Sequence, residues 1–168
     1  MKKKILFIIS VAFIVLLVLI YLFLIPNGKT KESREEILRD STAGKYVWEI
    51  SQEIKLHDYI ISSVYGNKEG LAIFKENGFG RYKLQGVNYR GKGEVIITQI
   101  IHEQEVYYVA WCNQADLDYA EVIYTIDNEE LEPRIFDVKE NSLISFKSPS
   151  DDFGMRIVYY DKNGNYYD

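Results

Sequence analysis

A thiol and two imidazoles are the side chains of this sequence best suited to nucleophilic or metal chemistry: Cys112, His57 and His102. A cysteine nucleophile needs a histidine base, and the residues Tyr108–Trp111 that precede Cys112 match no known nucleophile pattern. Neither histidine has a second histidine two or four positions away, so the zinc-binding spacing is missing. We therefore interpret Cys112 as a buried thiol and both histidines as solvated turn residues.

Several polar segments only partly match known binding loops. Asp161–Asn165 places oxygen atoms at alternate positions like the start of a calcium loop, but the sixth residue is Tyr166 where that loop needs glycine. A hairpin turn is the better interpretation, and we expect Asp116–Asp118 and Asp151–Asp152 to be solvated loop carboxylates. Gly91–Gly93 lacks the helix that a phosphate site needs. The sequence thus predicts no catalytic, cofactor-binding or metal-binding residue.

Tyrosine is the residue type that most strongly indicates a binding function, because the chain has 14 tyrosines and several are adjacent. The pairs are Tyr107-Tyr108, Tyr159-Tyr160 and Tyr166-Tyr167. Neighbouring residues in a strand point to opposite faces, so each pair would place one ring on each face. The outward rings could form an aromatic platform for a glycan or a partner protein. The alternative is cross-strand packing on a half-exposed sheet.

Short apolar runs alternate with turn residues from Tyr46 onward. About eight to ten short strands at regular spacing are typical of an antiparallel β-sandwich or barrel-like fold, which we predict for residues 46–168. Tyr159–Tyr167, with Asn163-Gly164 at its centre, is expected to be a hairpin. The other predicted strands are Val47–Ile50, Ile54–Leu56, Tyr59–Tyr65, Leu71–Phe74, Val95–Ile101, Glu105–Trp111, Tyr119–Ile126, Ser142–Phe146 and Met155–Tyr160.

A highly charged segment, residues 26–45, precedes this domain and is expected to be a stalk with a short helix at about Arg34–Ala43. Ser33 and Glu36 match the S-x-x-E capping box, with Ser33 as the N-cap. Only Ile37-Leu38 could be buried, so the helix is expected to be a stalk or a lid against the domain edge.

The longest apolar stretch is Ile5–Ile25, which contains no charged residue. As a helix it would span about 31 Å, close to the thickness of a bilayer core, and we predict a transmembrane anchor. It is longer than a signal-peptide core and no small-x-small cleavage site follows, so we expect it to be retained. Residues 1–4, with three lysines beside the apolar run, are predicted to be a cytoplasmic tail. Four basic residues on the other flank weaken this orientation: Lys29, Lys31, Arg34 and Arg39.

Charge and cysteine content narrow the possible partners. Residues 27–168 contain 17 basic and 25 acidic residues, a formal charge of −8. Nucleic-acid binding depends on basic residues that neutralise phosphates, so we expect no nucleic-acid partner. A single cysteine, Cys112, excludes an intramolecular disulfide.

The layout resembles small single-span envelope proteins of Gram-positive bacteria. It combines a lysine-rich start, one span, a charged stalk and a tyrosine-rich β domain that closes with Ile157–Gly164. The resemblance implies a cell-membrane protein with an extracytoplasmic domain, and it brings no functional residues. We expect a non-enzymatic module that binds a protein or cell-wall partner. The alternatives are an envelope hydrolase or transferase that uses carboxylates on the domain rim, and a regulatory subunit that acts through the membrane helix.

Overall fold

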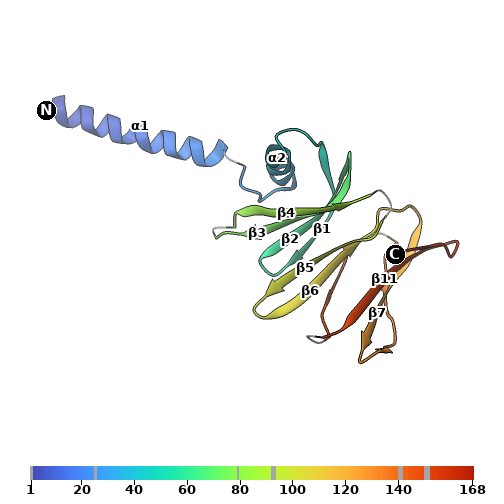
Figure 1. The fold of residues 1–168 in the computed structure, drawn as a ribbon. Coiled ribbons are helices and arrows are strands. Elements are labelled where there is room, and N and C mark those ends of the chain that lie inside the picture. Colours follow the sequence, from blue (N-terminus) through green and yellow to red (C-terminus); the bar gives the residue numbers. More distant parts are fainter. Residues whose placement is uncertain (1, 25, 79, 92–93, 140–141, 150–151) are drawn as a thin grey trace.

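The computed structural model describes residues 2–24, 26–78, 80–91, 94–139, 142–149 and 152–168, without the side chains of 2–6, 8 and 21–24. Within these residues the chain forms two helices and twelve strands, and all strand pairs are antiparallel (Figure 1). The prediction of a mainly β chain with antiparallel sheets is confirmed. The elements are α1 (Lys2–Leu24), α2 (Lys31–Ser41), β1 (Trp48–Leu56), β2 (Tyr59–Gly66), β3 (Glu69–Glu76), β4 (Tyr82–Arg90), β5 (Ile96–His102), β6 (Glu105–Trp111), β7 (Leu117–Ile126), β8 (Glu129–Glu130), β9 (Arg134–Asp137), β10 (Ile144–Lys147), β11 (Gly154–Asp161) and β12 (Tyr166–Tyr167).

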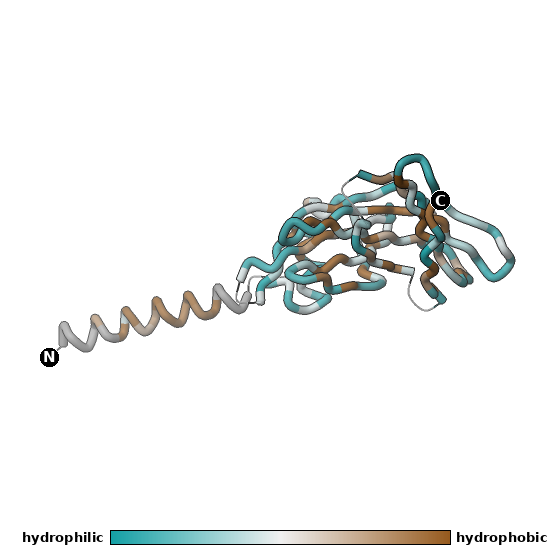
Figure 2. The backbone as a smooth tube through the Cα atoms, turned by 90° about the horizontal axis from the view of Figure 1, so that it is seen from below, coloured by the Kyte–Doolittle hydropathy of each residue, from teal (hydrophilic) through white to brown (hydrophobic). Residues whose placement is uncertain are grey.

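Helix α1 projects away from the β domain in both Figure 1 and Figure 2. Its described apolar side chains are exposed, from Ile20 at 43% to Phe7 at 71%. Over the part of the chain that the structure describes, no helix meets the combined length and hydropathy required to cross a bilayer. The anchor Ile5–Ile25, whose last residue lies outside the described residues, therefore stays a prediction from the sequence.

The strands form three sheets. The first is the meander β1-β2-β3-β4, the second has the order β10-β6-β5, and the third has the order β12-β11-β7-β8, with β9 also paired to β7. Three apolar cores separate four layers, because α2 packs on the first sheet and the sheets then pack on one another. The third sheet, which contains β7 and β11, lies at the end of the molecule farthest from α1 (Figure 1).

Strand β6 has two apolar faces, which explains why a sheet packs on each side of the second sheet. Tyr107, Val109 and Trp111 face the core shared with the first sheet. Tyr108, Ala110 and Cys112 face the core shared with the third sheet. The alternation predicted for this strand is therefore confirmed. Because both faces are apolar, both must be covered, and the second sheet is enclosed between its neighbours.

Helix α2 packs on the first sheet as a lid, with Leu38 fully buried. It begins three residues earlier than the predicted Arg34, and Thr30 is its N-cap, accepting a hydrogen bond from the Ser33 amide at 3.2 Å. The prediction that Ser33 caps the helix is wrong. The Ser33 hydroxyl instead accepts hydrogen bonds from the Asn27 and Gly28 amides, both at 2.9 Å, and fastens the preceding segment to the helix.

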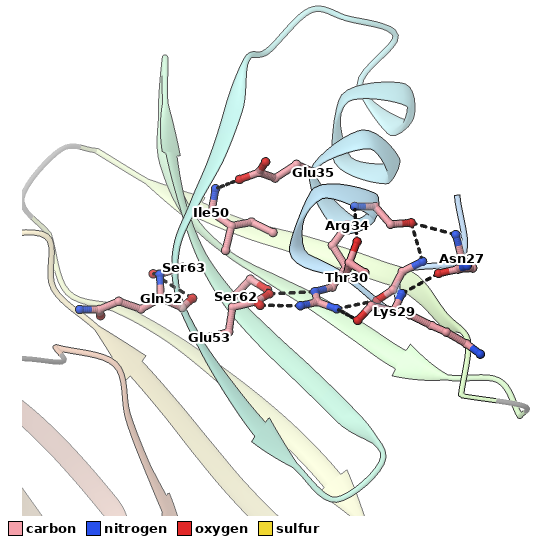
Figure 3. A network of polar contacts seen from close by, with 12 residues as sticks. Asn27, Lys29, Thr30, Arg34, Glu35, Ile50, Gln52, Glu53, Ser62 and Ser63 are labelled. Carbon is pink, nitrogen blue, oxygen red and sulfur yellow. Dashed lines mark hydrogen bonds and ion pairs between the residues drawn. The ribbon is translucent and has the colours of Figure 1, made fainter. Parts of the chain in front are cut away.

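An ion pair between a buried arginine and a half-buried glutamate joins this lid to the sheet (Figure 3). The guanidinium of Arg34 donates to both carboxylate oxygens of Glu53 on β1, at 2.8 and 2.5 Å. It also donates to the carbonyl oxygens of Gly28 and Lys29, at 2.6 and 3.0 Å. Ser62 on β2 donates to the same Glu53 carboxylate at 2.6 Å. One arginine thus binds the start of α2, the segment before it and the first sheet together.

Candidate functional site

Three tyrosines form a row across the outer face of the third sheet. Tyr160 on β11 pairs directly with Tyr166 on β12 and with Tyr119 on β7. Residues paired across antiparallel strands point to the same face, so these rings share one surface. The neighbouring position, Tyr159, faces the core and is fully buried. We call Tyr119, Tyr160 and Tyr166 the tyrosine row.

In the tyrosine row, two rings stack on each other and the third is exposed to solvent. The rings of Tyr119 and Tyr160 stack with centroids 4.6 Å apart and planes at 15°, whereas Tyr166 is 67% exposed. The Tyr160 hydroxyl donates to Glu121 at 3.1 Å. Partial burial and the Glu121 carboxylate raise the pKa of Tyr160, so its hydroxyl stays protonated and remains a donor at neutral pH.

An open hollow of about 300 Å³ continues the row beyond Tyr119. It is lined by Asp118, Tyr119, Ile135, Asp137 and Lys139. Asp118 lies at a bulge, because Tyr160 pairs with Tyr119 while Asp161 pairs with Leu117. A bulge re-aims the extra residue, and Asp118 lines the hollow beside Tyr119.

One lysine partly offsets the two aspartates of the hollow. The Lys139 ammonium lies 3.1 Å from Asp118 and 3.9 Å from Asp137. Its hydrogen bond with Asp118 raises the pKa of Lys139. These ion pairs are largely exposed and therefore weak, so a partner could displace them at little cost. Ile135, 69% exposed, supplies the apolar wall.

The three predicted tyrosine pairs behave differently. The alternation predicted one outward ring in each pair, and the structure shows that these are Tyr160 and Tyr166 in the last two pairs. Tyr107 and Tyr108 give no outward ring, because β6 lies in the enclosed second sheet. Tyr119 belongs to no pair of adjacent tyrosines, so the sequence pattern does not indicate it. Only the register between β7 and β11 brings it beside Tyr160.

The two histidines, expected to be separate solvated turn residues, lie against each other. The rings of His57 and His102 stack with centroids 4.1 Å apart and planes at 9°. His102 Nδ1 is 3.2 Å from an Asp58 carboxylate oxygen, and Tyr107 packs its ring 4.9 Å from that of His57. His57 adopts φ 55°, a backbone region that glycine and asparagine favour. The pair joins the β1-β2 turn of the first sheet to the end of β5 in the second.

Cys112 cannot use these histidines as a base. It follows β6 and faces the core toward the third sheet, whereas Tyr107, which contacts His57, lies near the start of β6 and faces the other way. Five residues of strand separate the two positions by about 16 Å. Burial, with a contribution from the Glu69 carboxylate, raises the pKa of Cys112 to about 12. The thiol is therefore inert, as expected for a buried cysteine.

The calcium-like segment is a hairpin turn between β11 and β12, as predicted. The Asp161 carboxylate accepts hydrogen bonds from the Asn163 and Asn165 amides at 2.8 and 2.9 Å, and from the Asn165 side chain at 2.8 Å. Its oxygens serve the turn itself. Across the described residues, no group of three or more histidine, cysteine or acidic side chains could hold a metal ion.

The other acidic loops and the glycine loop are described only in part. Asp116 lies 3.6 Å from Lys162. Asp152 is exposed, and Asp151, Lys92 and Gly93 lie outside the described residues.

Comparison with known proteins gives no relative from which roles could be carried over. No protein-family model matches the chain, and neither a curated protein nor a solved structure matches it significantly. The site must therefore be interpreted from its own chemistry.

Proposed function

We propose that this chain is a single-pass membrane protein whose three-sheet domain binds a partner protein through the tyrosine row and the adjoining hollow. The observation that carries this proposal is the row itself: Tyr119, Tyr160 and Tyr166 on one outer face, beside an open hollow. Tyrosine is enriched at protein interfaces, and an apolar centre with a charged rim is their usual composition. Ile135 supplies the apolar part, and the rim is Asp118, Asp137 and Lys139.

The anchor part of the proposal rests on the sequence and on α1. In the sequence, Ile5–Ile25 is an uncharged apolar run of the length expected of a membrane-crossing helix, and α1 covers Lys2–Leu24. Three lysines beside the apolar run favour a cytoplasmic N-terminus and an extracytoplasmic β domain. A reporter enzyme active only outside the cytoplasm, fused after Asp168, should be active; an inactive fusion with normal expression would reverse the orientation.

Two features favour a protein over a cell-wall glycan. Tyr119 and Tyr160 cover each other's faces, which leaves less free aromatic surface for a sugar ring to stack on. Strand β9 pairs with β7 on one side, and none of the described strands pairs with its other edge. An open edge next to exposed Ile135 suits an extended peptide that adds a strand to the sheet.

The alternative, a hydrolase or transferase that uses rim carboxylates, finds no comparable support. Acid catalysis at neutral pH needs a carboxyl group whose pKa is raised. Among the described residues, hydrogen bonds lower the pKa of the carboxyl groups of Glu32, Glu105 and Asp161, which is the direction opposite to the one that acid catalysis needs.

Site-specific photo-crosslinking in living cells tests the proposal. A benzophenone amino acid at Ile135 should capture one protein, identified by mass spectrometry. Tyr119→Ala and Tyr160→Ala should each reduce that capture by about tenfold or more, the loss typical of a residue central to an interface. The matched controls Tyr65→Ala and Tyr89→Ala remove exposed tyrosines from the first sheet and should leave capture unchanged. Capture that is insensitive to the tyrosine row, or that yields only glycan, would contradict the proposal.

A further inference from the structure

A second hollow lies where the chain leaves α1. Its volume is about 370 Å³, and it is bounded by the segment after α1, by α2 and by the start of β4. The lining residues are Pro26, Asn27, Ile37, Ser41, Asn77, Arg81, Tyr82, Lys83 and Leu84. We call this the juxtamembrane hollow.

The juxtamembrane hollow is held close to the end of α1 by direct bonds. The Tyr82 amide donates to the Asn27 carbonyl at 2.9 Å, which pins the segment to β4. Gly28 permits this close approach: it has φ 69°, and a Cβ there would lie 2.5 Å from the Tyr82 carbonyl oxygen. Only Ile25 separates the end of α1 at Leu24 from Pro26 at the rim. The hollow therefore stays within a few residues of the helix end.

The charge of the hollow is opposite to that of the domain. Residues 27–168 carry a formal charge of −8, yet the lining contains Arg81 and Lys83 and no acidic residue. Outside the lining, Lys29 places its ammonium beside Gly80 in the β3-β4 turn. Glu76 lies at the edge of the hollow, where its carboxylate accepts hydrogen bonds from the Gly80 amide at 3.1 Å and from the Tyr82 hydroxyl at 3.4 Å. The lining itself is positive, with two basic side chains and no acidic one.

The hollow is also apolar on one side. Ile37 from α2 and Leu84 from β4 line it together with Tyr82. Basic side chains beside an apolar wall match a molecule that carries a phosphate next to a hydrocarbon chain. Phospholipids have this chemistry, and basic residues next to a membrane helix attract anionic lipids.

We infer that the juxtamembrane hollow binds the phosphate headgroup of an anionic phospholipid from the leaflet at which α1 ends. The inference rests on the proposed anchor, because the anchor brings the hollow to the bilayer surface. It holds for either orientation of the chain, since the hollow and the helix end move together. Bound lipid would hold the membrane-proximal end of an otherwise acidic domain against the bilayer.

Hydrogen exchange of the full chain in lipid nanodiscs tests the inference. Backbone amides of residues 80–84 should exchange about tenfold more slowly in discs that contain phosphatidylglycerol than in discs of phosphatidylcholine alone. The double variant Arg81→Ser/Lys83→Ser should lose this difference. The control Lys55→Ser/Arg90→Ser removes the same charge from exposed positions elsewhere on the first sheet and should keep it.

Any other result would contradict either the anchor or the lipid site, and the two can be told apart. A chain that does not co-elute with either kind of disc would refute the anchor, and the lipid site with it. Co-elution without any effect of phosphatidylglycerol would refute the lipid site alone. Equal protection by soluble glycerol phosphate added to phosphatidylcholine discs would assign the hollow to a free phosphate ligand instead of the membrane. If the control variant also lost the slower exchange, the effect would depend on the net charge of the domain and not on the hollow, which would contradict the inference.

Discussion

Cys112 illustrates how burial controls a reactive side chain. Its pKa is raised to about 12, so at pH 8 about one thiol in ten thousand is ionised. We predict that a maleimide labels Cys112 in the folded chain at least about a hundredfold more slowly than in urea, because only the thiolate reacts and the site is closed. Mass spectrometry of timed reactions measures the ratio. Fast labelling of the native protein would show that the core around Cys112 opens.

Asp161 should make stability depend on pH. Hydrogen bonds from Asn165 and Asn163 lower its pKa in the folded state. A lowered carboxyl pKa stabilises the fold above the unfolded-state value, near 4, and this contribution is lost as pH falls through the folded-state value. We predict that Asp161→Asn lowers the melting temperature at pH 7 and that the difference from the original protein shrinks below pH 4. A difference that is independent of pH would show that the carboxylate charge is irrelevant.

Among the elements, α2 depends on Arg34 for its position. Arg34→Met would remove the ion pair and leave the Glu53 carboxylate, which is only 23% exposed, without its partner. We predict a loss of about 3 kcal/mol in the free energy of unfolding, measured by urea titration in a mild detergent. Arg39→Met, on the exposed side of the same helix, should change it by less than about 0.5 kcal/mol. Replacing both members, Arg34→Met with Glu53→Leu, should recover most of the loss.

Elements bounded by clear turn residues could be predicted from the sequence. The range Glu105–Trp111 matches β6 at both ends, because the turn before it and the apolar alternation within it are unambiguous. Strand β4 was missed because Gly86 interrupts its pattern. A bulge lies there: Ile73 of β3 pairs with Gly86 and Phe74 pairs with Leu84, so Gln85 is opposite no residue of β3. The cap of α2 was misplaced because Thr30 and Ser33 are both good N-caps.

The sites were harder to predict than the strands, because they depend on register between distant segments. The outward positions of Tyr160 and Tyr166 follow from alternation within one hairpin. Tyr119 joins them only through the pairing of β7 with β11. The stacked histidines come from a turn of the first sheet and a strand end of the second, 45 residues apart in the chain, so no local spacing could reveal their contact.

At the scale of the whole molecule, the enclosed second sheet should make unfolding cooperative. The second sheet contributes side chains to the core shared with the first sheet and to the core shared with the third. Unfolding of this sheet would therefore expose both cores to water together. Trp48 lies in the core under α2, and Trp111 lies between the first and second sheets. We predict that the single-tryptophan variants Trp48→Phe and Trp111→Phe each show one fluorescence transition in urea. After normalisation for any shift in stability, circular dichroism should give the same midpoint in each variant. Different midpoints would show that the layers unfold separately.

The bond between Asn27 and β4 has a consequence for the range of action of this protein. With α1 in a bilayer, the linker between the helix and the domain is very short. Helix α1 ends at Leu24, and Asn27 is already hydrogen-bonded to Tyr82 of β4. The tyrosine row lies on the sheet farthest from α1, so it would be carried at a nearly constant height above the lipid surface. Selection among partners would then depend on the height at which they present their binding segment as well as on affinity.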